Sequence, residues 1–310
     1  MRVFVAGATG VLGSRTVPLL VEAGHEVTGV ARTPAKAEQL RSAGATPVQA
    51  DLFDATAVVR AVKGHEMVCN LATHIPPVSK AARPRAMAEN DRIRREVSRH
   101  LVDAALAAGA RRYLQESIVF TYADHGKQWI FEDSLIDAPP YMRSALEAEG
   151  QARRFTESGA DGVVLRFGMF YGPGSSHTKV MVDAARWRLG AVLGDKHGFF
   201  SMVHVDDAAG AVVAALSVPA GTYNIAEDEP LTRADQLAAL AAAVGVRRLW
   251  APPRFVVALG GSAARALTRS QRVSNRRFKH ESGWAPRYPS VREGWPAVVA
   301  ALGVGAGRHF

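Results

Sequence analysis

A glycine-rich turn near the N-terminus constrains the fold of this chain more than any other feature. The apolar run at residues 2–6 leads directly into Gly7-Ala8-Thr9-Gly10-Val11-Leu12-Gly13, and a helical pattern follows at residues 12–23. Glycines at this spacing between a strand and a helix allow a sharp bend, close approach of the backbone to a ligand, and tight packing of helix on strand. Because the first turn of a helix offers free N–H groups and a partial positive charge, the motif predicts a site for a phosphate-containing ligand.

Short apolar runs alternate with helical patterns through the first half of the chain. Strands are expected at residues 2–6, 26–31, 46–49, 66–71, 112–116 and 162–167. Helices are expected at residues 12–23, 34–43, 55–62, 91–108 and 144–158, and several are followed by glycine, which favours a helix C-terminus. This alternation predicts a parallel sheet with helices on both faces.

The second half is patterned less regularly. It indicates a loop at residues 171–174, helices at 179–189, 206–216 and 233–244, strands at 200–205 and 221–226, and a tail rich in Pro and Arg. The sequence therefore predicts an α/β fold of the Rossmann type, a doubly wound parallel sheet with a smaller, interleaved C-terminal lobe. We expect residues 1–167, with about 200–226, to bind a nucleotide, and residues 168–199 and 227–310 to form the substrate lobe.

Composition and charge argue against several classes of protein. The 310 residues include 38 Lys and Arg against 29 Asp and Glu, a net charge of +9, but the basic residues are scattered in short doublets. Without a basic stripe interleaved with aromatic residues, nucleic-acid binding is not expected. The sequence has no apolar run typical of a membrane span and no signal-peptide layout. Cys69 is the only cysteine, so we expect no internal disulfide, no zinc site and a cytoplasmic location.

The residues after the second predicted strand bear on which dinucleotide binds. An NAD site usually ends this strand in a carboxylate that accepts a hydrogen bond from the ribose 2′-hydroxyl. Here the strand runs into Arg32-Thr33-Pro34-Ala35-Lys36, which contains no carboxylate. A guanidinium pairs with a 2′-phosphate, which a carboxylate would repel. We therefore predict NADP(H) as the cofactor, with Arg32 and Lys36 at its 2′-phosphate; two solvated surface charges are the alternative.

Together these motifs resemble an extended short-chain dehydrogenase/reductase of the NAD-dependent epimerase/dehydratase type. Further resemblance lies in Asp51-Leu52, Asn70-Leu71-Ala72, residues 165–174, residues 203–208 and residues 272–286. It extends over nearly the whole chain and implies a dinucleotide bound along the strand ends. The cofactor-binding residues that it implies are Gly7, Thr9, Gly10, Val11, Leu12, Gly13, Asp51, Leu52, Asn70, Leu71 and Ala72.

The catalytic motif departs from that of the family. Its Tyr-x-x-x-Lys is represented by Tyr141-Met142-Arg143-Ser144-Ala145, so alanine stands where the family has lysine. The family's hydroxyl residue, four positions before Tyr122, is Ile118 here. Ser117 is one residue away, and since neighbours on a strand face opposite sides, it needs a local shift to take over. The catalytic candidates that the resemblance implies are Tyr141, Ser117, Thr121 and His74.

Several other side chains are open substitutes for the missing groups. Lys80 and Lys179 lie in segments near the expected pocket, with a surface position as the alternative for each. His74, in the loop where the family places substrate, can act as an acid or base near neutral pH, and a merely polar loop residue is the alternative. Glu116 and Asp124 are further acid–base candidates.

The missing lysine bears on the direction of the chemistry. In the family it lowers the pKa of the tyrosine and holds the nicotinamide ribose. Without it, Tyr141 should keep a pKa near ~10, with roughly one part in a thousand ionised at neutral pH. Oxidation of an alcohol needs that base, whereas reduction of a carbonyl needs only a proton donor. A reductase is therefore affected less than an enzyme that begins by oxidising its substrate.

Three functions stay open. The first is an NADP-dependent reductase of a small or medium, largely apolar carbonyl or enone, with Tyr141 as proton donor. The second is a redox-neutral isomerase, cyclase or dehydratase on the same scaffold, and the third is a non-catalytic NADP-binding sensor protein. The stretches where sugar-nucleotide enzymes place an Asn and an Arg lack both here. An apolar substrate is favoured by Ile75, Pro76, Phe170, Trp187 and Phe199.

The helix at residues 91–108 also bears on assembly. It carries Ile93, Val97, Leu101 and Ala104 at helical spacing. The resemblance implies that this helix and the one after Tyr141 form the interface of a homodimer, and burial against the sheet is the alternative.

Overall fold

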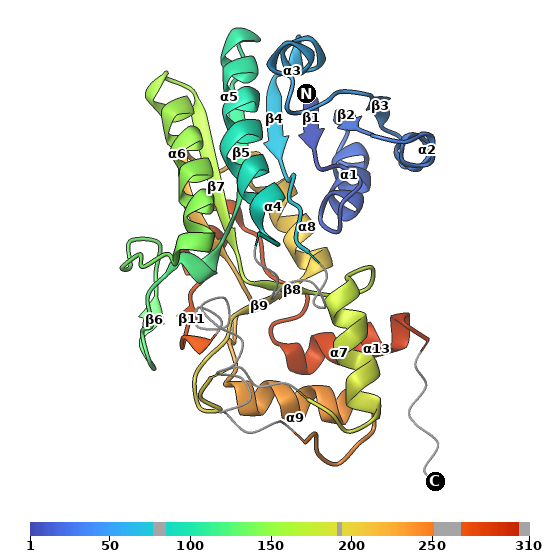
Figure 1. The fold of residues 1–310 in the computed structure, drawn as a ribbon, viewed down its shortest axis with the longest axis vertical. Coiled ribbons are helices and arrows are strands. Elements are labelled where there is room, and N and C mark those ends of the chain that lie inside the picture. The colour runs from blue at the N-terminus through green and yellow to red at the C-terminus, as the bar shows by residue number, and fades with distance from the viewer. Residues whose placement is uncertain (77–84, 191–193, 251–267, 304–310) are drawn as a thin grey trace.

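A seven-stranded parallel sheet forms the upper part of the molecule in the view of Figure 1. The computed structural model describes residues 1–76, 85–190, 194–250 and 268–303. The strand order is β10–β7–β5–β4–β1–β2–β3, and every neighbouring pair is parallel. The strands are β1 (Arg2–Ala6), β2 (Glu26–Val30), β3 (Thr46–Val48), β4 (Met67–Asn70), β5 (Arg112–Ile118), β7 (Asp161–Phe167) and β10 (Gly221–Ile225). The predicted fold class is confirmed.

Helices cover both faces of the sheet because each presents one apolar side to it. Along β1, Val3 and Val5 enter one apolar cluster, and Phe4 and Ala6 enter the other. The first cluster receives side chains from α1 (Gly13–Glu22), α2 (Pro34–Ser42), α8 (Val205–Ala214) and α12 (Arg276–Ser282). The second receives them from α3 (Ala55–Val62), α5 (Ser98–Ala107) and α6 (Arg143–Glu157).

The sheet grows in two directions from its middle. β2 and β3 lie on one side of β1, whereas β4, β5, β7 and β10 lie on the other. In doubly wound sheets, ligands bind outside the carboxyl ends of the strands where this reversal occurs. Gly7 follows β1 and Leu71 follows β4, so the glycine loop lies at that position.

The helix predicted at residues 91–108 is present, but its middle departs from regular α geometry. α4 (Ala88–Arg92) and α5 are separated by a π-helical turn, Ile93–Val97. A π turn adds a residue to the helical repeat and so changes which side chains face inward. Arg94 is buried, whereas Ile93, which the spacing placed on the apolar face, is half-buried.

Two short strand pairs lie outside the seven-stranded sheet, and one of their four strands falls within the strand predicted at residues 200–205. β6 (Trp129–Ile130) pairs with β11 (Arg272–Val273), and β8 (Met169–Tyr171) pairs with β9 (Met202–His204). The predicted loop at residues 171–174 therefore begins inside a strand. α7 (Ser176–Arg186), α9 (Arg233–Ala243) and α13 (Val291–Ala301) pack on a separate apolar cluster that includes Tyr171, Leu240 and Trp295. The division into a nucleotide domain and a substrate lobe stays a prediction.

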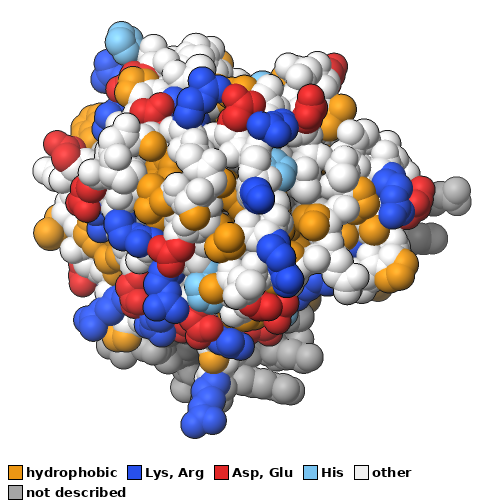
Figure 2. All heavy atoms as spheres, turned by 90° about the horizontal axis from the view of Figure 1, so that it is seen from above, with side chains coloured by type: hydrophobic (Ala, Val, Ile, Leu, Met, Phe, Trp, Pro, Cys, Tyr) orange, Lys and Arg blue, Asp and Glu red, His pale blue; other side chains and the backbone are white. Residues whose placement is uncertain are grey.

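The surface carries both signs of charge. Figure 2 shows Lys and Arg side chains interspersed with Asp, Glu and apolar side chains on the face seen from above. In the part of the chain that the structure describes, no helix is long and apolar enough to cross a membrane.

Candidate functional site

Two close backbone approaches shape the glycine loop. Gly7 has a φ of +79°, and a Cβ on it would lie 2.5 Å from the carbonyl oxygen of Leu71. A Cβ on Gly13 would lie 2.1 Å from the carbonyl oxygen of Gly7. The Gly10 N–H donates to the Gly7 carbonyl at 3.0 Å and closes the turn. Glycine is thus required at the first and last positions, where β1, β4 and α1 meet.

The first turn of α1 suits an anion. No side chain caps this helix at Leu12, and its first turn contains no acidic residue. Gly10 and Val11 are exposed, Thr9 is half-buried, and Leu12 packs into the core. The loop thus presents open backbone beside the positive end of the helix dipole, as a dinucleotide pyrophosphate requires.

Arg32 and Lys36 lie beyond the end of β2. Thr33 between them caps α2, because its hydroxyl accepts a hydrogen bond from the Lys36 N–H at 3.3 Å. Among the described residues, neither basic side chain has a hydrogen-bond or ion-pair partner, and the first turn of α2 contains no acid. Both cations therefore fit a ligand phosphate without a competing carboxylate.

Three of the other predicted cofactor residues lie at the end of β4. Leu71 and Ala72 follow β4 beside the glycine loop. The Asn70 side chain turns into the sheet, donating to Oε1 of Gln115 at 3.0 Å and accepting from the Ala72 N–H at 3.2 Å. It therefore shapes the strand end from within.

The Asp51-Leu52 pair lies after β3. The Asp51 carboxylate accepts from the Phe53 N–H at 2.9 Å and is exposed. The Leu52 carbonyl accepts a hydrogen bond from Nδ1 of His100 at 3.1 Å. This contact ties the segment after β3 to α5.

A buried hydrogen-bond network surrounds Ser117. Its hydroxyl donates to Oε1 of Glu149 at 2.6 Å. The guanidinium of Arg166 holds the same carboxylate from Nε at 2.8 Å and from Nη2 at 2.7 Å, and its Nη1 donates to the Tyr122 hydroxyl at 2.8 Å. Tyr122 in turn donates to Asn224 at 2.9 Å, and burial raises its pKa to about 12. Together these bonds tie β5, α6, β7 and β10 to one another.

Tyr141 lies in the turn Pro140–Met142 that precedes α6. It is half-buried and packs on an apolar cluster that includes Phe120, whose ring stacks on Phe200 at 5.4 Å. The Thr121 hydroxyl donates to the Ile118 carbonyl at 3.1 Å. Ala145, at the family's lysine position, is completely buried on the first turn of α6.

Sequence reasoning did not assign a role to Arg94. Nη2 of Arg94 lies 3.4 Å from Oε1 of Glu116, and their side chains are 2% and 7% exposed. Burial raises the pKa of Glu116, while the nearby guanidinium acts in the opposite direction. Arg94 Nε and Glu116 Oε2 are buried without a hydrogen-bond partner among the described residues. A charged residue next to an apolar stripe was the only sequence signal for this pair.

The other proposed acid–base groups are engaged elsewhere. The His74 side chain is exposed beside Glu89, with 3.5 Å between Nε2 and Oε2. The backbone N–H of His74 donates to Oδ1 of Asn90. The Asp124 carboxylate accepts from two backbone N–H groups, at 2.9 and 3.1 Å. Lys179 pairs with Asp183 on the surface at 2.6 Å. Lys80 lies outside the described residues.

The five apolar side chains proposed to favour an apolar substrate are dispersed. Trp187 is 82% exposed and Ile75 is 61% exposed. Phe170 packs on Phe167, and Phe199 lies against the guanidinium of Arg272. The apolar surface nearest to Tyr141 is instead the cluster around Phe120.

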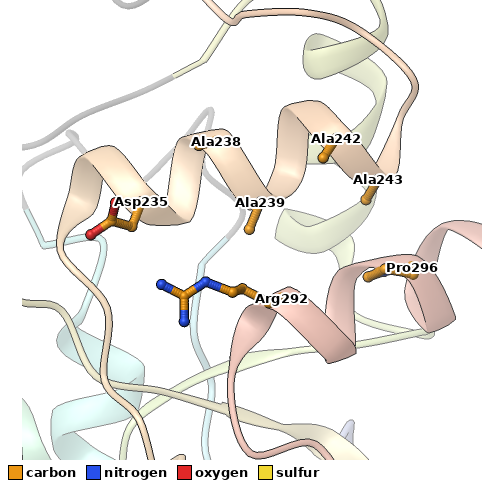
Figure 3. Close-up of a pocket in the computed structure, with 7 residues that line it drawn as sticks. All are labelled: Asp235, Ala238, Ala239, Ala242, Ala243, Arg292 and Pro296. Atoms are coloured by element: carbon orange, nitrogen blue, oxygen red, sulfur yellow. The ribbon is translucent and has the colours of Figure 1, made fainter.

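A separate hollow of about 490 Å³ lies between α9 and α13 (Figure 3). Four alanines of α9 line it, with Asp235, Arg292 and Pro296. Nη1 of Arg292 already pairs with Glu229 at 2.8 Å. None of the predicted cofactor or catalytic residues lines this hollow.

The late Asp206-Asp207 motif joins the C-terminal segment to the nucleotide-binding side. Asp206 pairs with Arg15 of α1 at 2.8 Å, and Arg15 also donates to the Pro173 carbonyl. Asp207 is buried, and its two oxygens accept from the backbone N–H groups of residues 287 and 288, at 2.8 and 3.1 Å. Burial raises the pKa of Asp207, and these two hydrogen bonds oppose that effect.

Comparison with known proteins identifies a matching family model and proteins that are similar to this chain in sequence. A family model described as the NAD dependent epimerase/dehydratase family matches residues 3–226. The chain is 36% identical over 309 residues to a 3-diazoavenalumate denitrifying reductase of a Streptomyces species, covering 95% of this chain and 99% of that protein. It is 29% identical over 269 residues to a 2-alkyl-3-oxoalkanoate reductase of Shewanella oneidensis, covering 78% of this chain and 66% of that protein.

Solved structures share the fold over nearly the full length. Human epimerase family protein SDR39U1 (isoform 2) with NADPH has a TM-score of 0.80 at 24% identity, covering 97% of this chain and 99% of that one. A UDP-glucuronic acid 4-epimerase from Bacillus cereus, in complex with UDP-glucuronic acid and NAD, has a TM-score of 0.78 at 18% identity, covering 98% and 99%.

Proposed function

Because the chain belongs to the NAD-dependent epimerase/dehydratase family, we propose that it is an NADPH-dependent reductase of a largely apolar acceptor. The observation that carries the proposal is the pairing of a complete dinucleotide loop with a buried alanine at position 145. The loop supports cofactor binding. The alanine places no amine at the position from which the family's lysine activates the tyrosine as a base, which supports reduction over oxidation.

The phosphate selectivity rests on Arg32 and Lys36. Two cations beyond β2, with no acid in the following helical turn, suit the additional phosphate of NADPH. A carboxylate that would bind the free ribose hydroxyl of NAD is absent from residues 32–36. We therefore expect NADPH to bind more tightly than NADH.

With a carbonyl or enone as acceptor, the chain's own task is to orient the substrate and supply a proton. The bound cofactor supplies hydride to the acceptor carbon. The Tyr141 hydroxyl then donates its proton to the oxygen that becomes the alcohol or enol, and the phenolate recovers a proton from water. The apolar side chains around Phe120 and Phe200 support an apolar or aromatic acceptor.

Substrate-dependent loss of NADPH absorbance tests this function. We expect turnover with aromatic aldehydes or conjugated enones and a fall of about a hundredfold in kcat for Tyr141→Phe, because a phenyl ring cannot donate the proton. Arg143→Gln, in the same turn region and exposed, is the matched control. Product formation without net loss of NADPH would instead favour the redox-neutral alternative. Cofactor binding without turnover would favour the sensor.

A second acceptor class, an aryl diazo compound, is favoured by the 36% identity with a reductase named for 3-diazoavenalumate. A diazonium group takes hydride at its terminal nitrogen and needs no proton, because Ar–N≡N⁺ and H⁻ give Ar–N=NH. Loss of N₂ then breaks the C–N bond, and the hydrogen ends on the ring carbon as Ar–H. Such an acceptor fits a site without the lysine at position 145.

The two acceptor classes respond differently to one substitution. With a benzenediazonium salt, Tyr141→Phe should retain turnover to within about threefold, and one N₂ should appear for each NADPH consumed. With an aldehyde or enone, the same variant should lose most turnover. Absence of N₂ from the diazonium reaction would exclude the second class.

A further inference from the structure

Two buried Arg–Glu pairs lie beside the carboxyl end of β5, and they differ in completeness. Glu116 and Ser117 are neighbours on the strand and therefore face opposite sides. On the side of Ser117, the Arg166–Glu149 pair uses both carboxylate oxygens and three guanidinium nitrogens. On the side of Glu116, Arg94 and Glu116 share a single contact, 3.4 Å between Nη2 and Oε1. Arg94 Nε and Glu116 Oε2 have no partner within the described chain.

An incomplete buried pair is costly for stability. Two charges taken out of water need good geometry and further hydrogen bonds to recover their hydration. The burial that raises the pKa of Glu116 reflects this cost. Arg94 enters the interior from the π-helical turn Ile93–Val97, a rare element that often marks functional sites. A costly pair on an unusual turn favours a role other than stability.

The pair lies at the level of the missing lysine. The Ser144 hydroxyl donates to Asp91 at 2.6 Å, and Arg95 pairs with Glu147 at 3.0 Å, so the π turn runs along the start of α6. Ala145 stands between these two contacts on α6, and Arg94 stands between them on the other segment. The turn that carries Arg94 therefore packs along the same stretch of α6 that holds the family's lysine position.

The same region is where the reacting end of a dinucleotide belongs. A doubly wound sheet binds one mononucleotide over each half, with the pyrophosphate at the loop after β1. Arg32 marks the adenosine half beyond β2. The other half then extends over β4 and β5, toward Glu116.

We propose that the Arg94–Glu116 pair lies next to the nicotinamide end of the bound cofactor. Its two opposite charges set the relative affinity of the site for the uncharged reduced ring and the cationic oxidised ring. The inference rests on the proposed function, because it requires NADP(H) to bind. A guanidinium carries a positive charge and therefore disfavours a cationic ring. The Glu116 carboxylate offsets this repulsion. Arg94 and Glu116 are thus specificity-determining residues for the redox state of the cofactor.

Separate binding measurements with NADPH and NADP⁺, by fluorescence and calorimetry at one pH, test the proposal without turnover. Glu116→Gln removes the offsetting negative charge, so the ratio of the NADP⁺ to the NADPH dissociation constant should rise about tenfold. Arg94→Met removes the cation, so the ratio should fall about tenfold. Arg95→Met, from the exposed pair on the same turn, should leave the ratio unchanged.

Opposite shifts in the two variants cannot come from a loosened fold, which would weaken both forms of the cofactor together. Ratios equal to the wild-type value in Glu116→Gln and Arg94→Met would overturn the role of the pair. If Arg94→Met shows no cooperative thermal transition, Glu116→Gln decides alone, and an unchanged ratio there overturns the proposal. A wild-type protein that binds neither form would contradict the proposed function itself, and the role of the pair would fall with it.

Discussion

The Ser117 hydroxyl donates a 2.6 Å hydrogen bond to Glu149, a carboxylate that Arg166 already holds through two nitrogens. The hydroxyl thus contributes to a junction between β5, α6 and β7. We expect Ser117→Ala to lower the free energy of unfolding by about 1.5–3 kcal/mol, the range for a hydrogen bond to a charged group. Urea denaturation measures this loss. A variant as stable as the wild type would show that the bond contributes nothing to folding.

The Glu149 carboxylate should matter more than any surface acid on the same helix. Glu149→Gln leaves the buried Arg166 guanidinium without its counter-charge, and we expect it to cost about 3–5 kcal/mol. Glu147→Gln is the control, because Glu147 is half-exposed in its pair with Arg95 and should cost less than about 1 kcal/mol. Equal losses in the two variants, by urea denaturation, would contradict the account of this network.

Two glycines with nearly the same backbone conformation allow the effect of backbone strain to be separated from that of a steric clash with a new Cβ. Gly7 and Gly24 have nearly the same φ, +79° and +81°, but only at Gly7 would a Cβ meet the backbone of Leu71, at 2.5 Å. Gly7→Ala should therefore weaken NADPH binding at least about tenfold, because the loop must move. Gly24→Ala should cost about 1 kcal/mol of stability and leave binding intact. Fluorescence titration with NADPH tests this, and equal affinities in both variants would refute it.

The buried carboxyl group of Glu227 should make the stability of the protein depend on pH. It is 1% exposed, and burial raises its pKa to about 8, while its usual value in an unfolded chain is 4.5. Between these values the folded protein keeps a proton that the unfolded chain has lost, so the free energy of unfolding should fall as pH rises across this window.

The loss should reach a few kcal/mol by about pH 8, and Glu227→Gln should remove it. Urea denaturation of both proteins at about pH 5 and about pH 8 checks the difference. Parallel stability curves for wild type and variant would mean that Glu227 titrates normally.

Most of the sheet could be predicted from the sequence because its strands are buried on both faces and appear as continuous apolar runs. β1 and α3 have the predicted bounds. α13 was missed because Pro296 and the surrounding Pro and Arg residues suggested an irregular tail. The signal was present in Ser290 and Glu293, which cap the helix reciprocally.

The backbone geometry of the candidate site was predictable at the glycine loop and less so around Ser117 and Arg94. Glycine spacing fixes a local backbone geometry, so the loop could be located from the residues alone. The partner of Ser117 depends on Glu149, which lies on a helix far along the chain, and no local pattern reveals it. The burial of Arg94 could not be predicted because it depends on a π turn, whereas helical periodicity assumes a regular repeat.

The most direct test of the central claim is a comparison of NADPH and NADH affinities for the wild type, Arg32→Ala and Arg41→Ala. Arg41 lies on α2 in an exposed pair with Glu38 and is the matched control. We predict that the wild type and Arg41→Ala bind NADPH at least about tenfold more tightly than NADH, and that Arg32→Ala loses most of this difference by weakening NADPH binding alone. Equal affinities for the two cofactors in the wild type would contradict it.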